Sequence, residues 1–237
     1  MKTLGIIGYG SFGKFAAEQL ASYFSISIYD PNKPVPPQYS ANLDVVCRAD
    51  YVILAIPLAA YHKLFDQIIS MLGQASVVVD IASVKVEPIK LIKAKLNPRQ
   101  PYLATHPLFG PESASHSLNG FKLVVCESNL PTEQIYLVKN FCKNLGLDLV
   151  ELSADDHDQQ MATVQALTFF LARTLNEFGL HDMQFQTPSF QRLLDLADLD
   201  KKHSTELLQT IWSGNKYSAT VRKKFINEMI KLDNEIK

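Results

Sequence analysis

A glycine-rich turn near the amino terminus constrains the fold of this chain more than any other feature. The apolar run Leu4–Ile7 breaks into Gly8-Tyr9-Gly10-Ser11-Phe12-Gly13 and continues into helix-forming residues. With this spacing, the first glycine permits a tight strand-to-helix turn, the second lets the backbone approach a pyrophosphate, and the third lets helix and strand pack closely. Because a strand precedes the turn and a helix follows it, a dinucleotide site is favoured over a purely structural turn. The predicted cofactor contacts are Gly8, Gly10, Ser11, Phe12 and Gly13.

The next predicted strand, Ile26–Tyr29, ends in the acidic residue Asp30. An acid about 20 residues beyond the glycine turn accepts hydrogen bonds from the ribose hydroxyls of a dinucleotide. A carboxylate at this position repels a 2′-phosphate, so we expect NAD rather than NADP. Lys33 lies close by and keeps NADP as the alternative.

Short apolar segments alternate with helical segments through the first part of the chain. This alternation predicts an α/β fold, namely a Rossmann-type, doubly wound, mostly parallel sheet with helices on both faces. Ligands of such sheets bind at the carboxyl ends of the strands. The predicted strands are Leu4–Ile7, Ile26–Tyr29, Tyr51–Ile56, Val77–Ile81, Tyr102–Thr105, Leu123–Cys126 and Asp148–Glu151.

The pattern changes after Leu152, where apolar residues begin to recur at helical spacing. Acidic residues open a first helix near Ser153 and Gly179 ends it, and further helices are predicted over Ser189–Leu199 and from Ser204 onward. We therefore expect two domains, a dinucleotide-binding domain at 1–152 and a smaller all-helical domain at 153–237. A helical layer this thin cannot cover its own apolar stripes, so we expect it to form a homodimer.

The composition excludes several classes of protein. The chain is 47% hydrophobic and 20% charged with a formal net charge of -1, and it has no basic block, so we expect neither a nucleic-acid nor an anionic-membrane partner. The longest apolar stretch, Tyr51–Tyr61, is too short to cross a bilayer, and the glycines interrupt the first apolar run as no signal peptide would. Cys47, Cys126 and Cys142 lack metal-ligand spacing, which predicts reduced thiols in the cytoplasm and no metal site.

Chemically useful residues follow several predicted strands. Pro57 ends the exit of one strand, where the backbone can support a nicotinamide or the proline can simply terminate the strand. Ser83 and Lys85 follow the next, placing a hydroxyl and an ammonium at the crevice, although a serine there is often only a helix cap. His106 follows the strand after that. Its imidazole suits general acid–base catalysis at neutral pH, whereas most histidines are structural.

The segment Thr105-His106-Pro107-Leu108-Phe109-Gly110-Pro111-Glu112-Ser113 resembles the prephenate and arogenate dehydrogenases of tyrosine biosynthesis. The segment Asp80–Lys85, the glycine turn, Asp156-His157-Asp158 and Val164-Gln165-Ala166-Leu167 belong to the same resemblance, which runs to about Gly179. It implies that His106 accepts the hydroxyl proton at C4 of the cyclohexadienol ring and that Ser83 orients this hydroxyl. It also implies substrate contacts from Glu112, Ser113, His157 and Gln165.

The implied reaction transfers a hydride from ring C4 to NAD while the ring loses carbon dioxide. Aromatisation drives this step, so the protein has to position the ring and accept one proton, and it needs no metal.

Two positions depart from the family pattern. Phe169 stands where many relatives have a second histidine, and Asp198–Lys202 lacks the arginine that clamps a substrate carboxylate in microbial members. Arg192, Lys201 and Lys202 are candidates to replace it, although the two lysines also suit a solvated charge pair.

Two other functions remain as alternatives. A β-hydroxyacid-type dehydrogenase would need a catalytic lysine on the first helix of the second domain, and Ser153–Gly179 contains none. A dinucleotide-binding sensor without turnover is compatible with Phe169 and with the missing arginine.

Overall fold

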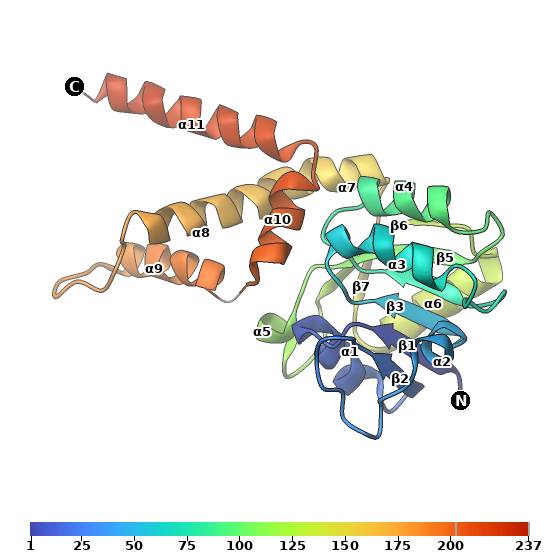
Figure 1. Cartoon of the computed structure of the whole chain (residues 1–237). Helices are drawn as coiled ribbons and strands as arrows, with labels where there is room; N and C mark the ends of the chain where they lie inside the picture. Colours follow the sequence, from blue (N-terminus) through green and yellow to red (C-terminus); the bar gives the residue numbers. More distant parts are fainter. Residues whose placement is uncertain (202, 237) are drawn as a thin grey trace. The chain divides into compact units, whose positions relative to one another are not determined.

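A computed structural model describes residues 1–201 and 203–236 (Figure 1). The chain divides into two compact units, Met1–Ala154 and a second unit that begins at Asp155. Each unit is described by itself below. Lys202, one of the candidates to replace the family arginine, lies outside the described residues.

The first unit is built on a 7-stranded sheet in the order β2-β1-β3-β4-β5-β6-β7. Its strands are β1 (Thr3–Ile7), β2 (Ser25–Tyr29), β3 (Tyr51–Leu54), β4 (Val77–Asp80), β5 (Tyr102–Pro107), β6 (Lys122–Ser128) and β7 (Asp148–Glu151). Every predicted strand is present, and the α/β, doubly wound, mostly parallel prediction is confirmed. The pairing of β5 with β6 is antiparallel, and β7 runs parallel to β6. An apolar run carries no information on strand direction, so the sequence pattern could not indicate this reversal.

Helices cover both faces of the sheet because adjacent strand residues point to opposite sides. Ile6 of β1 packs in one apolar cluster with Ala16 of α1, whereas Ile7 packs in another with Phe65 of α3 and Ile92 of α4. The helices of this unit are α1 (Ser11–Leu20), α2 (Leu43–Cys47), η1 (Leu58–Ala60), α3 (Tyr61–Ile68), α4 (Val86–Lys95), α5 (Pro111–Ala114) and α6 (Thr132–Asn144). Buried on both faces, β1, β3 and β4 read as continuous apolar runs.

The second unit is helical, as the sequence predicts. It contains α7 (Ala154–Met161), η2 (Ala162–Leu167), α8 (Thr168–Glu177), α9 (Pro188–Lys201), α10 (Thr205–Ser213) and α11 (Ser218–Glu235). The first three follow one another without a break, and η2 is a π-helix. At the end of α8, Gly179 adopts φ +84° and the Leu180 N–H donates to the Leu175 carbonyl at 3.1 Å, a glycine-dependent helix stop. Across the described residues, no helix has both the length and the apolar character that a membrane span requires.

Candidate active site

The register of the sheet brings four strand ends to one edge. Ile7 of β1 pairs with Leu54 of β3, Leu54 pairs with Asp80 of β4, and Asp80 pairs with Ala104 of β5. These strands are parallel, so the residues after this row all leave the sheet at the same edge. The strand order also reverses at β1, because β2 and β3 lie on its two sides. A doubly wound sheet binds its ligands at such a switch point.

The three glycines of the first turn have different structural reasons to be glycine. Gly8 adopts φ +104°, and a Cβ there would lie 2.4 Å from the Ala55 carbonyl oxygen. A Cβ on Gly13 would lie 2.1 Å from the Gly8 carbonyl oxygen. Gly10 has an ordinary φ of -72°. Beyond its chain neighbours, the one described atom within 4 Å of a Gly10 Cβ is Lys33 Nζ, at 3.7 Å.

Packing of the protein therefore explains Gly8 and Gly13 but leaves Gly10 unexplained. Space above Gly10, at the amino end of α1, fits a group that approaches the backbone closely, as a pyrophosphate does. Gly10 is the N-cap of α1 and has no side chain to cap the first N–H groups. Ser11 is exposed and Phe12 is half-buried against Phe15, with ring centroids 5.7 Å apart. These residues fit a dinucleotide.

Asp30 is held rigidly at the end of β2. Its Oδ2 accepts the Tyr9 N–H at 2.7 Å, and its Oδ1 accepts the N–H groups of Asn32 and Lys33 at 2.8 and 3.0 Å. The carboxylate is thus fixed to the glycine turn itself. A carboxylate oxygen accepts more than one hydrogen bond, so ribose hydroxyls remain possible donors to Asp30. Pro57 is exposed at the exit of β3, where it precedes η1.

His106 lies within β5 rather than after it. Beyond the end of β4, the strand continues to Pro107 by pairing with β6, with His106 opposite Val124 and a register shift between Ala104 and Thr105. A bulge of this kind commonly re-aims a side chain next to an active site. His106 is 3% exposed and Ser83 is 9% exposed. The antiparallel partner β6, which the sequence pattern did not indicate, therefore positions the candidate catalytic histidine.

A buried polar network lies at the carboxyl ends of β3, β4 and β5. The Lys85 ammonium forms an ion pair with Asp80, both side chains are fully buried, and Lys85 also donates to the Thr105 carbonyl. The Tyr61 hydroxyl donates to Asp80 Oδ1 at 2.7 Å, and Thr105 Oγ1 donates to the Asp80 carbonyl at 2.8 Å. Burial, and after it the Asp80 charge, holds the pKa of Tyr61 well above its usual value, so its hydroxyl stays a donor.

The expected position of the Lys85 ammonium is wrong. The sequence placed it in the crevice, whereas the structure places it beneath the strand ends, because Asp80 draws it into the core. An acid and a base that bracket Ser83 in Asp80–Lys85 were the signal that pointed to this ion pair.

Glu112 and Ser113 belong to the short helix α5, and both are exposed. Ser113 Oγ accepts the Gly110 N–H at 3.0 Å and donates to the Gly110 carbonyl at 3.2 Å. Ser113 therefore caps α5, a structural task that its position after Gly110 and Pro111 explains.

In the second unit, His157 is fully buried. Its Nδ1 lies 2.8 Å from Asp158 Oδ1, and the Asp158 carbonyl accepts the Asn215 side-chain amide at 2.6 Å. Gln165 is half-buried within the π-helix η2, where the Trp212 indole donates to the neighbouring Ala166 carbonyl at 3.3 Å. Single π-helical turns inside α-helices are frequent at functional sites.

The departures from the family pattern have structural counterparts. Phe169 is buried, and its ring meets the His203 ring edge-to-face at 4.7 Å. Lys201 forms an exposed ion pair with Asp198 at 2.9 Å. Arg173, which sequence reasoning did not consider, binds the buried carboxylate of Asp200 at 2.8 Å.

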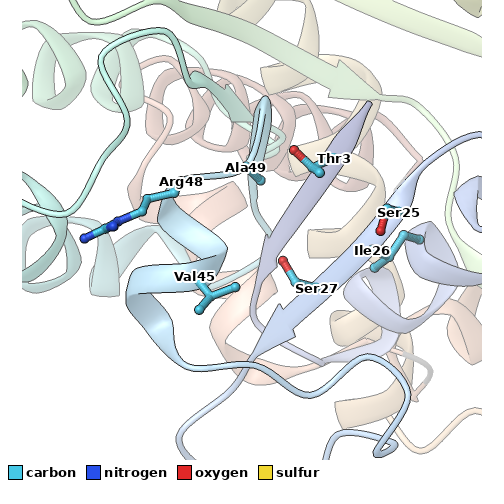
Figure 2. Close-up of a pocket in the computed structure, with 7 residues that line it drawn as sticks. All are labelled: Thr3, Ser25, Ile26, Ser27, Val45, Arg48 and Ala49. Atoms are coloured by element: carbon cyan, nitrogen blue, oxygen red, sulfur yellow. The ribbon is translucent and has the colours of Figure 1, made fainter. Parts of the chain in front are cut away.

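The pocket shown in Figure 2 lies away from these residues. It is lined by Thr3 at the start of β1, Ser25, Ile26 and Ser27 of β2, and Val45, Arg48 and Ala49 of and after α2. Thr3 and Ser25 are the first residues of parallel strands, so this hollow is at the end of the sheet opposite the glycine turn. Within the described part of the chain, no group of three or more His, Cys, Asp or Glu side chains is arranged to hold a metal ion.

The fold and the strand-end site define a Rossmann-type nucleotide-binding protein with an added helical unit. Residues 38–151 match the family model for the nucleotide-binding domain of prephenate dehydrogenase. The chain is 26% identical over 227 residues to arogenate dehydrogenase 2 of Arabidopsis thaliana, covering 90% of this chain and 63% of the relative. It is 34% identical over 133 residues to the T-protein of Enterobacter agglomerans, covering 56% of this chain and 33% of the relative.

Solved structures agree with these sequence matches. Prephenate dehydrogenase from Aquifex aeolicus, in complex with hydroxyphenyl propionate and NAD+, superposes with a TM-score of 0.75 at 20% identity, covering 100% of this chain and 91% of that one. The chain belongs to the prephenate and arogenate dehydrogenase family. It spans 63%, 46% and 37% of the length of three curated relatives that it matches.

Proposed function

We propose that this protein is an NAD-dependent dehydrogenase that oxidises and decarboxylates prephenate or arogenate in tyrosine biosynthesis. One observation carries the proposal. His106 sits in the bulged end of β5, at the sheet edge where the glycine turn and Ser83 also lie. Family membership supports the same reaction, and related proteins are named as dehydrogenases of these two substrates.

In this proposal the glycine turn binds the pyrophosphate through Gly8, Gly10, Ser11, Phe12 and Gly13. Asp30 binds the ribose hydroxyls, and Pro57 borders the nicotinamide. The bound nicotinamide supplies the acceptor for the hydride from ring C4. NAD is favoured over NADP because a 2′-phosphate would face the fixed Asp30 carboxylate.

His106 is the proposed general base, and Ser83 orients the substrate hydroxyl. The hydroxyl at C4 loses its proton to the imidazole as the hydride leaves the same carbon. The bond to the ring carboxylate breaks, and its electron pair enters the ring, which becomes aromatic as carbon dioxide departs. Both side chains are largely buried, so water competes little for the proton.

Four further residues are proposed to bind substrate. Glu112 and Ser113 lie on α5, and their exposure leaves them able to contact a ligand. His157, oriented by Asp158, and Gln165, in the π-helix, are the proposed residues of the second unit.

We also propose a homodimer formed through the helical unit. Ile226, Met229 and Ile230 of α11 are 37%, 54% and 56% exposed, and their spacing puts them on one side of the helix. Ser218 is the one residue of α11 that is buried. An 18-residue helix with this much exposed apolar surface is typical of an interface.

A reducing compartment, which we propose to be the cytoplasm, suits the cysteines. Cys47, Cys126 and Cys142 form no disulfide. Burial raises the pKa of Cys47 and of Cys142 to about 11, so both remain thiols at neutral pH.

The direct test follows NADH formation by the purified protein at neutral pH, with prephenate and with arogenate. Turnover of either substrate supports the proposal, and the ratio of kcat/KM values identifies the preferred one. NAD binding without turnover of either substrate would instead support a dinucleotide sensor, which the core position of Phe169 also favours.

A further inference from the structure

We propose that Lys85, paired with Asp80, is a positioning residue that holds His106 in its reactive orientation. This inference rests on the proposed function. It concerns groups that never reach the substrate, because the Lys85 and Asp80 side chains are both 0% exposed.

The contacts of this ion pair converge on the residue before His106. The sheet ladder between β4 and β5 ends at Asp80 and Ala104, so Thr105 lies beyond the last paired residue of β4. The Lys85 ammonium takes the place of a ladder donor to the Thr105 carbonyl. In return, Thr105 Oγ1 donates to the Asp80 carbonyl at 2.8 Å. Thr105 is thus held to the end of β4 from both its main chain and its side chain.

Thr105 is also the point at which the strand needs fixing. The register shift of β5 against β6 falls between Ala104 and Thr105, and the direction of His106 depends on the geometry of this bulge. Tyr61 fixes Asp80 from the opposite side through its 2.7 Å hydrogen bond. The network therefore ties together β3, β4 and β5 at the position from which Ser83 and His106 both emerge.

Stability alone does not account for a fully buried ion pair. Withdrawing two charges from water costs as much as, or more than, their attraction returns, and well-packed neutral residues often serve stability equally well. What the ion pair adds is a defined direction, because the ammonium must satisfy a carboxylate and a carbonyl at once. The consequence is a fixed position for Thr105 and, through it, for His106.

The test replaces both charges together, as Asp80→Asn with Lys85→Met, so that no uncompensated charge remains buried. The matched control is Asp66→Asn with Lys95→Met. That pair joins α3 to α4 at 2.7 Å, but it is partly exposed and lies away from the strand ends. Thr105→Val is a milder second variant that removes one hydroxyl contact and leaves the ion pair in place.

The first readout does not depend on turnover. The His106 ring signals of the unliganded protein, observed by NMR with labelled histidine, are expected to shift or broaden in the Asp80/Lys85 variant and in Thr105→Val. They should stay in place in the Asp66/Lys95 control. Because this measurement needs no substrate, it tests the positioning role even if the dehydrogenase proposal fails. Unchanged His106 signals in both test variants would overturn the inference.

The second readout is a kinetic cycle with His106→Asn. We expect the Asp80/Lys85 variant to lower kcat about 10- to 100-fold, the range for a small displacement of a catalytic group. KM and NAD affinity should change less than about threefold. In the His106→Asn background the same replacement should cost little more, because its effect passes through His106. Losses that multiply in both backgrounds would show a general structural role and contradict the proposal. If the double replacement does not fold, Thr105→Val completes the cycle.

Discussion

At the scale of single residues, the glycine turn separates what the protein needs from what a ligand needs. Gly8 and Gly13 are required by neighbouring backbone atoms, whereas the described protein atoms leave space around Gly10. A sequence pattern presents the three as equivalent, and the distinction requires coordinates. It also gives a direct test of the cofactor site.

Gly10→Ala should leave the free energy of unfolding within about 1 kcal/mol of the original and lower NAD affinity at least about tenfold. Gly13→Ala should destabilise the protein by about 1–3 kcal/mol or more, because its Cβ meets the Gly8 carbonyl oxygen. Denaturation and NAD titration of both variants check this. Tight NAD binding by folded Gly10→Ala would place the pyrophosphate elsewhere.

Asp30 should govern the choice of cofactor. Asp30→Ala is expected to weaken NAD binding about tenfold or more and to narrow the preference for NAD over NADP. The control is Asp44→Ala, which removes an exposed acid from α2. Binding of NAD and NADP to each protein is measured by fluorescence titration. Equal affinity for both cofactors in the original protein would refute the assignment.

His106→Asn should fold, bind substrate nearly as before and lower kcat roughly a hundredfold to ten-thousandfold, as expected for a lost general base. The ascending limb of the pH profile near the usual histidine pKa should disappear. Ser83→Ala should cost less, because it removes an orienting hydrogen bond and not the proton acceptor. Wild-type rates in His106→Asn would exclude the mechanism.

At the scale of elements, sequence periodicity predicted the strands and the helical region but not every boundary or direction. Apolar runs mark buried strands, and Gly179 marks a helix end, because both signals are local. The reversal at β6, the bulge before His106 and the π-helix depend on contacts between distant residues. For the same reason, the sequence identified His106 but not the Lys85 contacts behind it.

Helices α8 and α9 are joined by a polar contact that sequence reasoning missed. Arg173 and Asn176 of α8 both donate to Asp200 of α9. Arg173→Met should lower the free energy of unfolding by about 1–2 kcal/mol, because the buried carboxylate loses its charged donor. Arg192→Met, on the exposed side of α9, should stay within about 0.5 kcal/mol. Urea titrations of both variants measure the difference, and equal midpoints would contradict it.

At the scale of the whole molecule, the exposed apolar side of α11 predicts association (Figure 1). Sedimentation at micromolar concentration should give a mass near twice 26.6 kDa. Met229→Glu with Ile230→Glu should shift it towards the monomer, because two charges would be buried in the interface. Leu137→Glu, at an exposed apolar position on α6, should not. A monomer at this concentration in the original protein would refute the dimer.

The π-helix η2 sets the phase between the two halves of one continuous helix. A π-helical turn accommodates an extra residue in an α-helix, and each α-helical residue advances the face by about 100°. Deleting Thr163 would restore regular α-helix and rotate α8 by that angle relative to α7. Phe169 and Ala172 would turn away from their packing partners while His157 kept its place. This helix therefore tolerates substitutions far better than a change of one residue in its length.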